Sequence, residues 1–192
     1  MDCSKIQVGF AQEACQALAV PGTGPRVILI SFSDIDKSKS AVTDNVISSL
    51  VLQKGAKGYE VDSLPNATVG SDSINVGTYV RTHAHNVIVR IFQKSEAAKK
   101  FINGLTNAKV VAIVENNEHG NAGDVKYEVY GWDSGLGLSD LTTGTDMADN
   151  VVYQATLASD TNALENTLPK SFYADSEAAT DAAIIALLSP AS

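Results

Sequence analysis

The sequence has little of several residue types that mark specialised classes of protein. Its 192 residues include only two cysteines, Cys3 and Cys15, in no metal-binding or redox spacing, so we expect reduced thiols and no disulfide framework. Five prolines exclude a Pro-rich or collagen-like chain. The longest apolar runs, residues 27–30 and 182–188, fall far short of the roughly 20 residues of a membrane span. The first residues show no basic segment followed by an apolar one, so we expect neither a secretory signal nor a membrane partner.

Basic residues are also scarce, and they are unevenly distributed. The formal net charge is −8, which disfavours a protein that reads nucleic acid through a basic surface. Residues 1–110 carry 12 Lys or Arg against 9 Asp or Glu, a net +3, whereas residues 111–192 carry 2 against 13, a net −11. This asymmetry predicts two faces of opposite sign, or an acidic surface that keeps a β-rich protein in solution.

What the chain does contain is the pattern of a globular, strand-rich domain. A hydrophobic fraction of 44% with 19% charged residues is typical of a folded core, and we expect one domain over residues 1–192. Alternating and β-branched runs predict strands at 26–32, 45–53, 59–64, 74–92, 109–114, 124–131, 151–157 and 170–173. The strand at 124–131 is expected to continue through glycines to residue 138. Residues 33–43, 65–73, 115–123 and 139–150 are polar and are expected to be loops or turns. The half-polar composition of 74–92 indicates a long hairpin that stands off the core.

Two segments have clear helical patterns. In 95–105, Ser95 is the expected N-cap with Glu96 in the first turn. Its apolar stripe comprises Ala97, Phe101, Ile102 and Leu105. In 175–188, Asp175 is the expected N-cap and Pro190 ends the helix. Its stripe comprises Ala179, Ala183, Ile184, Leu187 and Leu188.

These elements predict a mainly β fold with flanking helices. We expect an antiparallel β-sandwich or half-barrel with one central helix and a C-terminal helix. Residues 1–25, with a weak helical pattern at 7–20, form an expected N-terminal arm, and residues 174–192 form the C-terminal helix and tail.

Motifs that carry reactions are absent from the sequence. There is no GxSxG, HExxH, GxxxxGK[ST] or GxGxxG, so we expect no enzyme and no cofactor, and we assign no catalytic, cofactor-binding or metal residue. His83 and His85 project from one face of the expected strand, and a carboxylate with two imidazoles can bind zinc. The remaining ligands would come from His119, Glu115 and Glu118. We favour the alternative that the two histidines line a solvated strand face.

The sequence also contains an acidic cluster and an aromatic cluster. The acids Asp133, Asp140, Asp146 and Asp149 lack the spacing of a calcium loop. The only tryptophan, Trp132, lies near three tyrosines in the expected fold. These tyrosines are Tyr127, Tyr130 and Tyr153. The four aromatic residues could form a platform that binds a sugar, but we expect them to lie in the core.

Two stretches together resemble a known family. Residues 126–140 (KYEVYGWDSGLGLSD) resemble the strand, Gly, aromatic and Gly-Leu segment of bacteriophage tail tube proteins. Residues 151–173, which end in LPKSFY, are similar to the segment that follows it in those proteins. The β–helix–β order around 95–105 also fits, and the resemblance covers roughly residues 75–175.

The resemblance implies a structural virion protein. Tail tube subunits, and the related tubes of contractile injection systems, form hexameric rings that stack head-to-tail into a conduit for DNA ejection. The implied partners are copies of the same chain, with sheath, tape-measure, tail terminator and baseplate proteins beyond them. Genomic DNA passes through without specific binding, and the tail is assembled in the host cytoplasm. The alternatives are another virion component (a connector, head-completion or decoration protein) and a stand-alone β-sandwich binding module.

Overall fold

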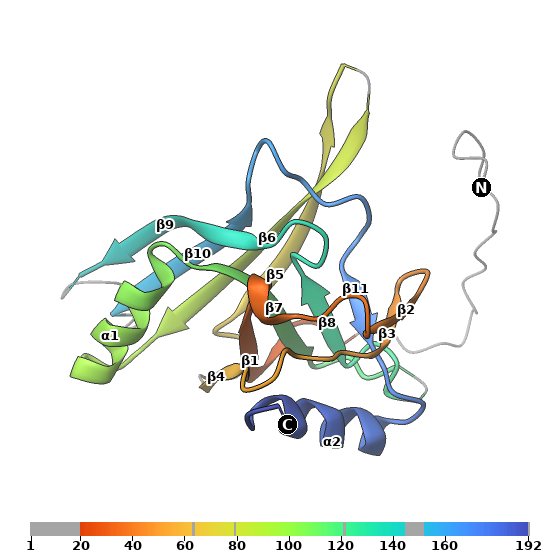
Figure 1. Cartoon of the computed structure of the whole chain (residues 1–192). Coiled ribbons are helices and arrows are strands. Elements are labelled where there is room, and N and C mark those ends of the chain that lie inside the picture. The colour runs from red at the N-terminus through yellow and green to blue at the C-terminus, as the bar shows by residue number, and fades with distance from the viewer. Residues whose placement is uncertain (1–19, 63, 79, 121, 145–151, 192) are drawn as a thin grey trace.

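The computed structural model describes residues 20–62, 64–78, 80–120, 122–144 and 152–191 (Figure 1). Cys3, Cys15, Asp146, Asp149 and nearly all of the helix expected at 7–20 lie outside these residues. The strands are β1 (Thr23–Ser31), β2 (Ala41–Thr43), β3 (Val46–Ser49), β4 (Tyr59–Asp62), β5 (Val69–Val76), β6 (Arg81–Ile91), β7 (Lys109–Asn116), β8 (Tyr127–Tyr130), β9 (Leu136–Thr143), β10 (Tyr153–Ser159) and β11 (Lys170–Phe172). The helices are η1 (Phe32–Asp34), a 3₁₀ turn, α1 (Glu96–Leu105) and α2 (Glu177–Leu187).

The fold is mainly β with two α-helices, as the sequence predicts. Within the described residues eleven strands form one sheet, which does not close, in the order β2-β3-β11-β8-β7-β9-β10-β6-β5, with β1 between β7 and β4. The described strand pairs are antiparallel except for β11 and β3, which run parallel, so the sheet is mixed. After β10 the chain crosses to the neighbourhood of β8, where β11 lies between β8 and β3. β11 pairs antiparallel with β8 and parallel with β3.

Two central strands, β1 and β7, are buried on both faces. Val27 and Leu29 of β1 face one apolar cluster, and Ile28 and Ile30 face a second. The same alternation divides β7 between the two clusters. A strand that is covered on both sides reads as a continuous apolar run, which explains why residues 26–32 show no polar alternation.

Each α-helix covers one of these clusters. In α1 the N-cap Ser95 accepts the Ala98 N–H at 3.1 Å, as expected. Ala98, Ile102 and Leu105 face the first cluster, so the expected stripe is wrong at Ala97, which is exposed. The two helices lie on different sides of the molecule, with α1 and α2 well separated in Figure 1.

The N-cap of α2 is one residue later than expected. Ser176 accepts the Ala179 N–H at 3.2 Å, whereas Asp175 has a φ of 68° and lies outside the helix. Ile184 and Leu187 pack into the second cluster. Ala179 of the expected stripe is exposed, and the buried position is Thr180.

The strand expected to continue from 131 to 138 is interrupted by a turn. Gly131 and Gly135 both have a φ of 76°, which favours glycine, and the Gly135 N–H donates to the Gly131 carbonyl. β9 then begins at Leu136 and extends to Thr143, so the loop expected at 139–150 does not begin at residue 139. Likewise, β2 lies within the loop expected at 33–43, and η1 begins at Phe32, where the expected strand 26–32 was to end, and extends into that loop.

Candidate functional site

The β5–β6 hairpin extends beyond the rest of the sheet (Figure 1). β5 pairs with β6 over its whole length, from Val69↔Ile88 to Val76↔Arg81. β10 supports β6 only over residues 86–91, so the outer part of the hairpin has no neighbouring strand among the described residues. The hairpin that the sequence predicts at 74–92 is therefore confirmed, although its first strand begins earlier, at Val69.

Apolar side chains are exposed on the outer part of this hairpin. Ile74, Val76 and Val80 are 64%, 69% and 66% exposed. β5 is also the last strand in the sheet order, and in the described part of the chain it pairs only with β6. An unpaired strand edge with exposed apolar residues is a template for pairing with another chain. We call Ile74, Val76 and Val80, with the outer edge of β5, the hairpin surface.

A buried polar cluster lies where the hairpin joins the sheet. His83 and His85 lie on one face of β6, as the alternation predicts, and both turn toward Asp72 on β5. The Nδ1 atom of His83 is 2.7 Å from Asp72 Oδ2. The Nε2 atom of His85 is 3.7 Å from Asp72 Oδ1, a buried atom that makes no hydrogen bond within the described residues. His85 is buried, and the side chains of His83 and Asp72 are 21% and 11% exposed. The face is therefore largely shielded from water at His85 and partly at His83, which corrects our interpretation of it as a solvated strand face.

His85 is the most deeply placed of these groups, with 2% of its surface exposed. Its Nδ1 atom accepts the Gly131 N–H at 3.1 Å, and its Nε2 atom lies 3.0 Å from the Thr167 carbonyl oxygen, to which it donates. The Tyr130 ring packs edge-on against the imidazole, with 5.7 Å between ring centroids. Burial lowers the pKa of His85 more than the nearby carboxylates of Glu165 and Asp72 raise it.

Glu165 is a buried carboxylate, 1% exposed, in the connection between β10 and β11. Its side chain accepts the Asp133 N–H at 2.6 Å and the Ser134 N–H at 2.8 Å. Its backbone forms a two-way bridge with His83, with N···O distances of 2.8 and 2.9 Å. Glu165 therefore connects β6, the β10–β11 connection and the turn between β8 and β9.

An apolar groove lies between α1 and the strands β1, β4 and β7. It has a volume of about 420 Å³, and its lining includes Leu29, Tyr59, Phe101 and Val110, with Lys100 as its one ionisable amine among the described lining residues. A groove of this size falls within the range of small-molecule sites. It contains no group placed for chemistry on a ligand.

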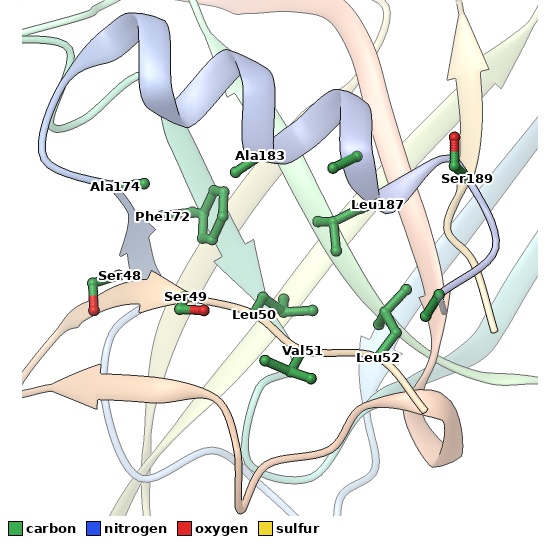
Figure 2. A pocket seen from close by; sticks show the side chains of 12 residues that line it. Ser48, Ser49, Leu50, Val51, Leu52, Phe172, Ala174, Ala183, Leu187 and Ser189 are labelled. Carbon is green, nitrogen blue, oxygen red and sulfur yellow. The ribbon is translucent and has the colours of Figure 1, made fainter. Parts of the chain in front are cut away.

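A second cavity, of about 500 Å³, lies between α2 and residues 48–52 (Figure 2). Leu187 and Ala183 of α2 face Phe172 and Leu50 across it. Its described lining contains serines and apolar residues but no ionisable side chain. This cavity is a gap in the second apolar cluster and offers no catalytic group.

The structure does not bring together the metal ligands considered from the sequence. His119 lies beside Glu177 on α2, with 3.1 Å between Nδ1 and Oε1, and not beside His83 or His85. Glu118 accepts the Val20 and Gly120 backbone N–H groups instead. The described residues contain no group of three or more His, Cys, Asp or Glu that could hold a metal ion.

The remaining sequence candidates have structural positions. Asp133 accepts the Asn166 backbone N–H at 3.2 Å, while Asp140 is exposed on β9. The aromatic residues expected in the core are buried there, which confirms that prediction: Tyr127, Tyr130, Trp132 and Tyr153. Sequence reasoning missed Asp72 because residues 65–73 were expected to be a loop, whereas β5 begins at Val69. It missed Glu165 because this residue lies in no motif and its partners are distant in the chain.

Comparisons with known proteins add no assignment. A scan against protein-family models, a search of curated proteins and a search of solved structures each found no match. None of the helices in the described ranges is long and apolar enough to cross a membrane.

Proposed function

We propose that this chain is a structural subunit that assembles with its own copies into stacked hexameric rings, as a phage tail tube protein does. The observation that carries the proposal is the hairpin surface, an open strand edge with three exposed apolar side chains. The sequence resemblance at 126–140 and 151–173 supports the same class. The tail-tube-like identity of the fold is part of this proposal.

The energetic reason lies in what the isolated subunit leaves exposed. Full burial of an aliphatic side chain contributes about 1.5–3 kcal/mol. Covering Ile74, Val76 and Val80 therefore offers several kcal/mol before the cost of association is counted. A head-to-tail contact between unlike surfaces repeats from copy to copy, and it forms a ring where the rotation closes. In the proposed ring the hairpin surface meets a different surface of the neighbouring copy, which makes the contact head-to-tail.

The charge asymmetry supports the direction of assembly and the cargo. Residues 1–110 carry a net +3 and residues 111–192 a net −11, and complementary patches set orientation more than affinity. Phosphates along DNA are repelled by acidic walls and held by basic ones. We therefore propose that part of the acidic excess faces the lumen of the tube. A net basic lumen in a cryo-EM reconstruction would contradict this part of the proposal.

The test is to place charge on the hairpin surface. In the double variant Ile74→Asp/Val76→Asp, two alternate residues on one face of β5 become acidic, which opposes burial against a neighbour. We expect rings or filaments with a central hole for the wild-type protein by negative-stain microscopy, and a folded monomer for the variant. Leu168→Asp/Ile185→Asp is the matched control, because its two residues are 53% and 58% exposed but lie outside the hairpin. Assembly of the hairpin variant, or a wild-type monomer at high concentration, would overturn the proposal.

A second candidate function is a stand-alone binding module, which the groove beside α1 favours. An apolar wall with the single amine of Lys100 suits a small apolar ligand that carries an acidic group. Size-exclusion chromatography separates the two functions, because a binding module stays monomeric with or without ligand. The other virion components considered from the sequence would assemble as well, and the stacking of rings into a continuous tube distinguishes the proposed function from theirs.

A further inference from the structure

The hydrogen bonds of His85 require a neutral imidazole. Its Nε2–H donates to the Thr167 carbonyl oxygen at 3.0 Å, and its unprotonated Nδ1 accepts the Gly131 N–H at 3.1 Å. Both nitrogens are therefore in use, one in each role. A second proton can go only to Nδ1, where it would point at the Gly131 N–H and remove that hydrogen bond.

Charged or titratable groups surround His85 from several elements, while the described residues of β10 contribute only the Ser159 hydroxyl, which accepts the His85 backbone N–H. Asp72 approaches from β5 and His83 from β6 itself. Tyr130 packs edge-on from β8, with its hydroxyl donating to Glu128. Glu165 approaches from the β10–β11 connection. The two nearest carboxylates attract an imidazolium, but burial opposes it more strongly, so the pKa of His85 lies below its ordinary value.

The bond to Gly131 is one of the ties between the hairpin base and the turn from β8 to β9. Residue 85 is also the first residue of β6 beyond the part that β10 pairs with, which begins at 86. The second tie passes through Glu165, whose backbone bridges His83 and whose carboxylate holds the same turn. Beyond these two ties, the hairpin base is held at residue 85 by the His85 backbone N–H, which donates to Ser159 Oγ of β10 at 3.2 Å. Loss of the Gly131–His85 bond therefore removes one of the contacts that fix the hairpin base, at the point where the strand pairing with β10 ends.

We propose that His85 is an acid-sensitive latch: neutral, it fixes the hairpin base to the turn between β8 and β9, and its protonation releases the hairpin. The sign follows from linkage. A histidine whose folded pKa is lowered binds its proton more readily in the released state, so acid favours release as the pH falls below the ordinary value of 6.5. The latch does not depend on the proposed assembly. A further consequence, that acid weakens the contacts made through the hairpin surface, rests on the proposed function.

The latch can be tested on the full chain by two measurements. ¹⁵N-imidazole NMR gives the tautomer and titration of each of the three histidines. We expect His85 to be protonated on Nε2 at neutral pH and to take up its second proton below the ordinary histidine pKa of 6.5. Hydrogen–deuterium exchange of hairpin peptides, corrected for the intrinsic pH dependence of exchange, gives the release. We expect the wild-type protein to lose protection at the hairpin base as His85 takes up its proton.

Variants assign the effect to one residue. In His85→Asn an amide oxygen takes the place of Nδ1 as acceptor and cannot titrate, so acid should no longer cause the loss of protection. His83→Asn and His119→Asn are the matched controls and should keep it. Exchange protection that stays unchanged while His85 titrates would overturn the latch, and so would an imidazole that already carries both protons at neutral pH. Both outcomes are measured on the wild-type protein, so the test holds even if a variant does not fold. Ring formation is scored separately, so that an intact latch in a monomeric protein would contradict the proposed function alone.

Discussion

Replacing Glu165 by alanine tests how strongly the buried cluster holds the turn between β8 and β9. The carboxylate accepts two backbone N–H groups, from Asp133 at 2.6 Å and from Ser134 at 2.8 Å. A hydrogen bond to a charged group contributes about 1.5–3 kcal/mol. Both donor residues are half-buried, so water can replace part of each bond in the variant, and the lower value applies to each. We expect Glu165→Ala to lower the free energy of unfolding by about 3 kcal/mol.

The assay for this prediction is urea unfolding followed by tryptophan fluorescence. Trp132 is the only tryptophan, is buried, and lies in the turn that Glu165 holds. Glu165→Gln keeps one acceptor oxygen but sets its amide N–H₂ against the second donor, so we expect about half the loss. Asp140→Ala is the matched control, because Asp140 is exposed. A loss for Glu165→Ala within about 0.5 kcal/mol of this control, the range of ordinary surface substitutions, would refute the reasoning.

Two further predictions concern the helices. Ser95→Ala removes the side chain that accepts the Ala98 N–H, and it should lower the unfolding free energy by about 1 kcal/mol in urea titrations; no change would contradict the capping role. For Asp181, burial raises the pKa, but hydrogen bonds from Lys126 and Tyr127 lower it more, so the net pKa is below the ordinary 3.8. Its ionised form then stabilises the fold above pH 3.8, and this contribution is lost as the pH falls further. Asp181→Asn should therefore weaken the pH dependence of unfolding below pH 4, and an unchanged dependence would contradict the prediction.

The elements best predicted from sequence are those whose signal is local. The apolar run at 26–32 and the N-cap of 95–105 carry local information, so β1 and α1 lie close to the predicted ranges. β1 nevertheless begins at Thr23, within the expected N-terminal arm, and the α1 stripe is wrong at Ala97. The α2 cap was displaced by one residue because Asp175 and Ser176 are both good N-caps, and only the backbone at Asp175 decides between them. The parallel pairing of β11 with β3 depends on a crossing of the chain that no local pattern contains.

The candidate site was only half visible in the sequence. The alternation of 79–86 places His83 and His85 on one face, and this was found. Glu165 was not found, because it lies in a polar connection where a glutamate is ordinarily solvated, and its partners are about 30 and 80 residues away in the chain. Long-range burial of this kind leaves no periodic trace, since one connection crosses over a turn only in the folded protein.

The cluster of Asp72, His83 and His85 lies where the hairpin leaves the sheet, and this position bears on why the hairpin base is held rigid. β10 stops supporting β6 at residue 86, and a two-stranded ribbon beyond such a point is marginally stable and free to bend. His85 and His83 are the inward-facing residues immediately beyond that point, and both are tied by hydrogen bonds to elements outside the hairpin. A hairpin that only connects two strands needs no such ties, and burying ionisable groups to make them has a desolvation cost. A hairpin that must meet a neighbour at a fixed angle does need them, because a rigid base lowers the conformational entropy lost on contact.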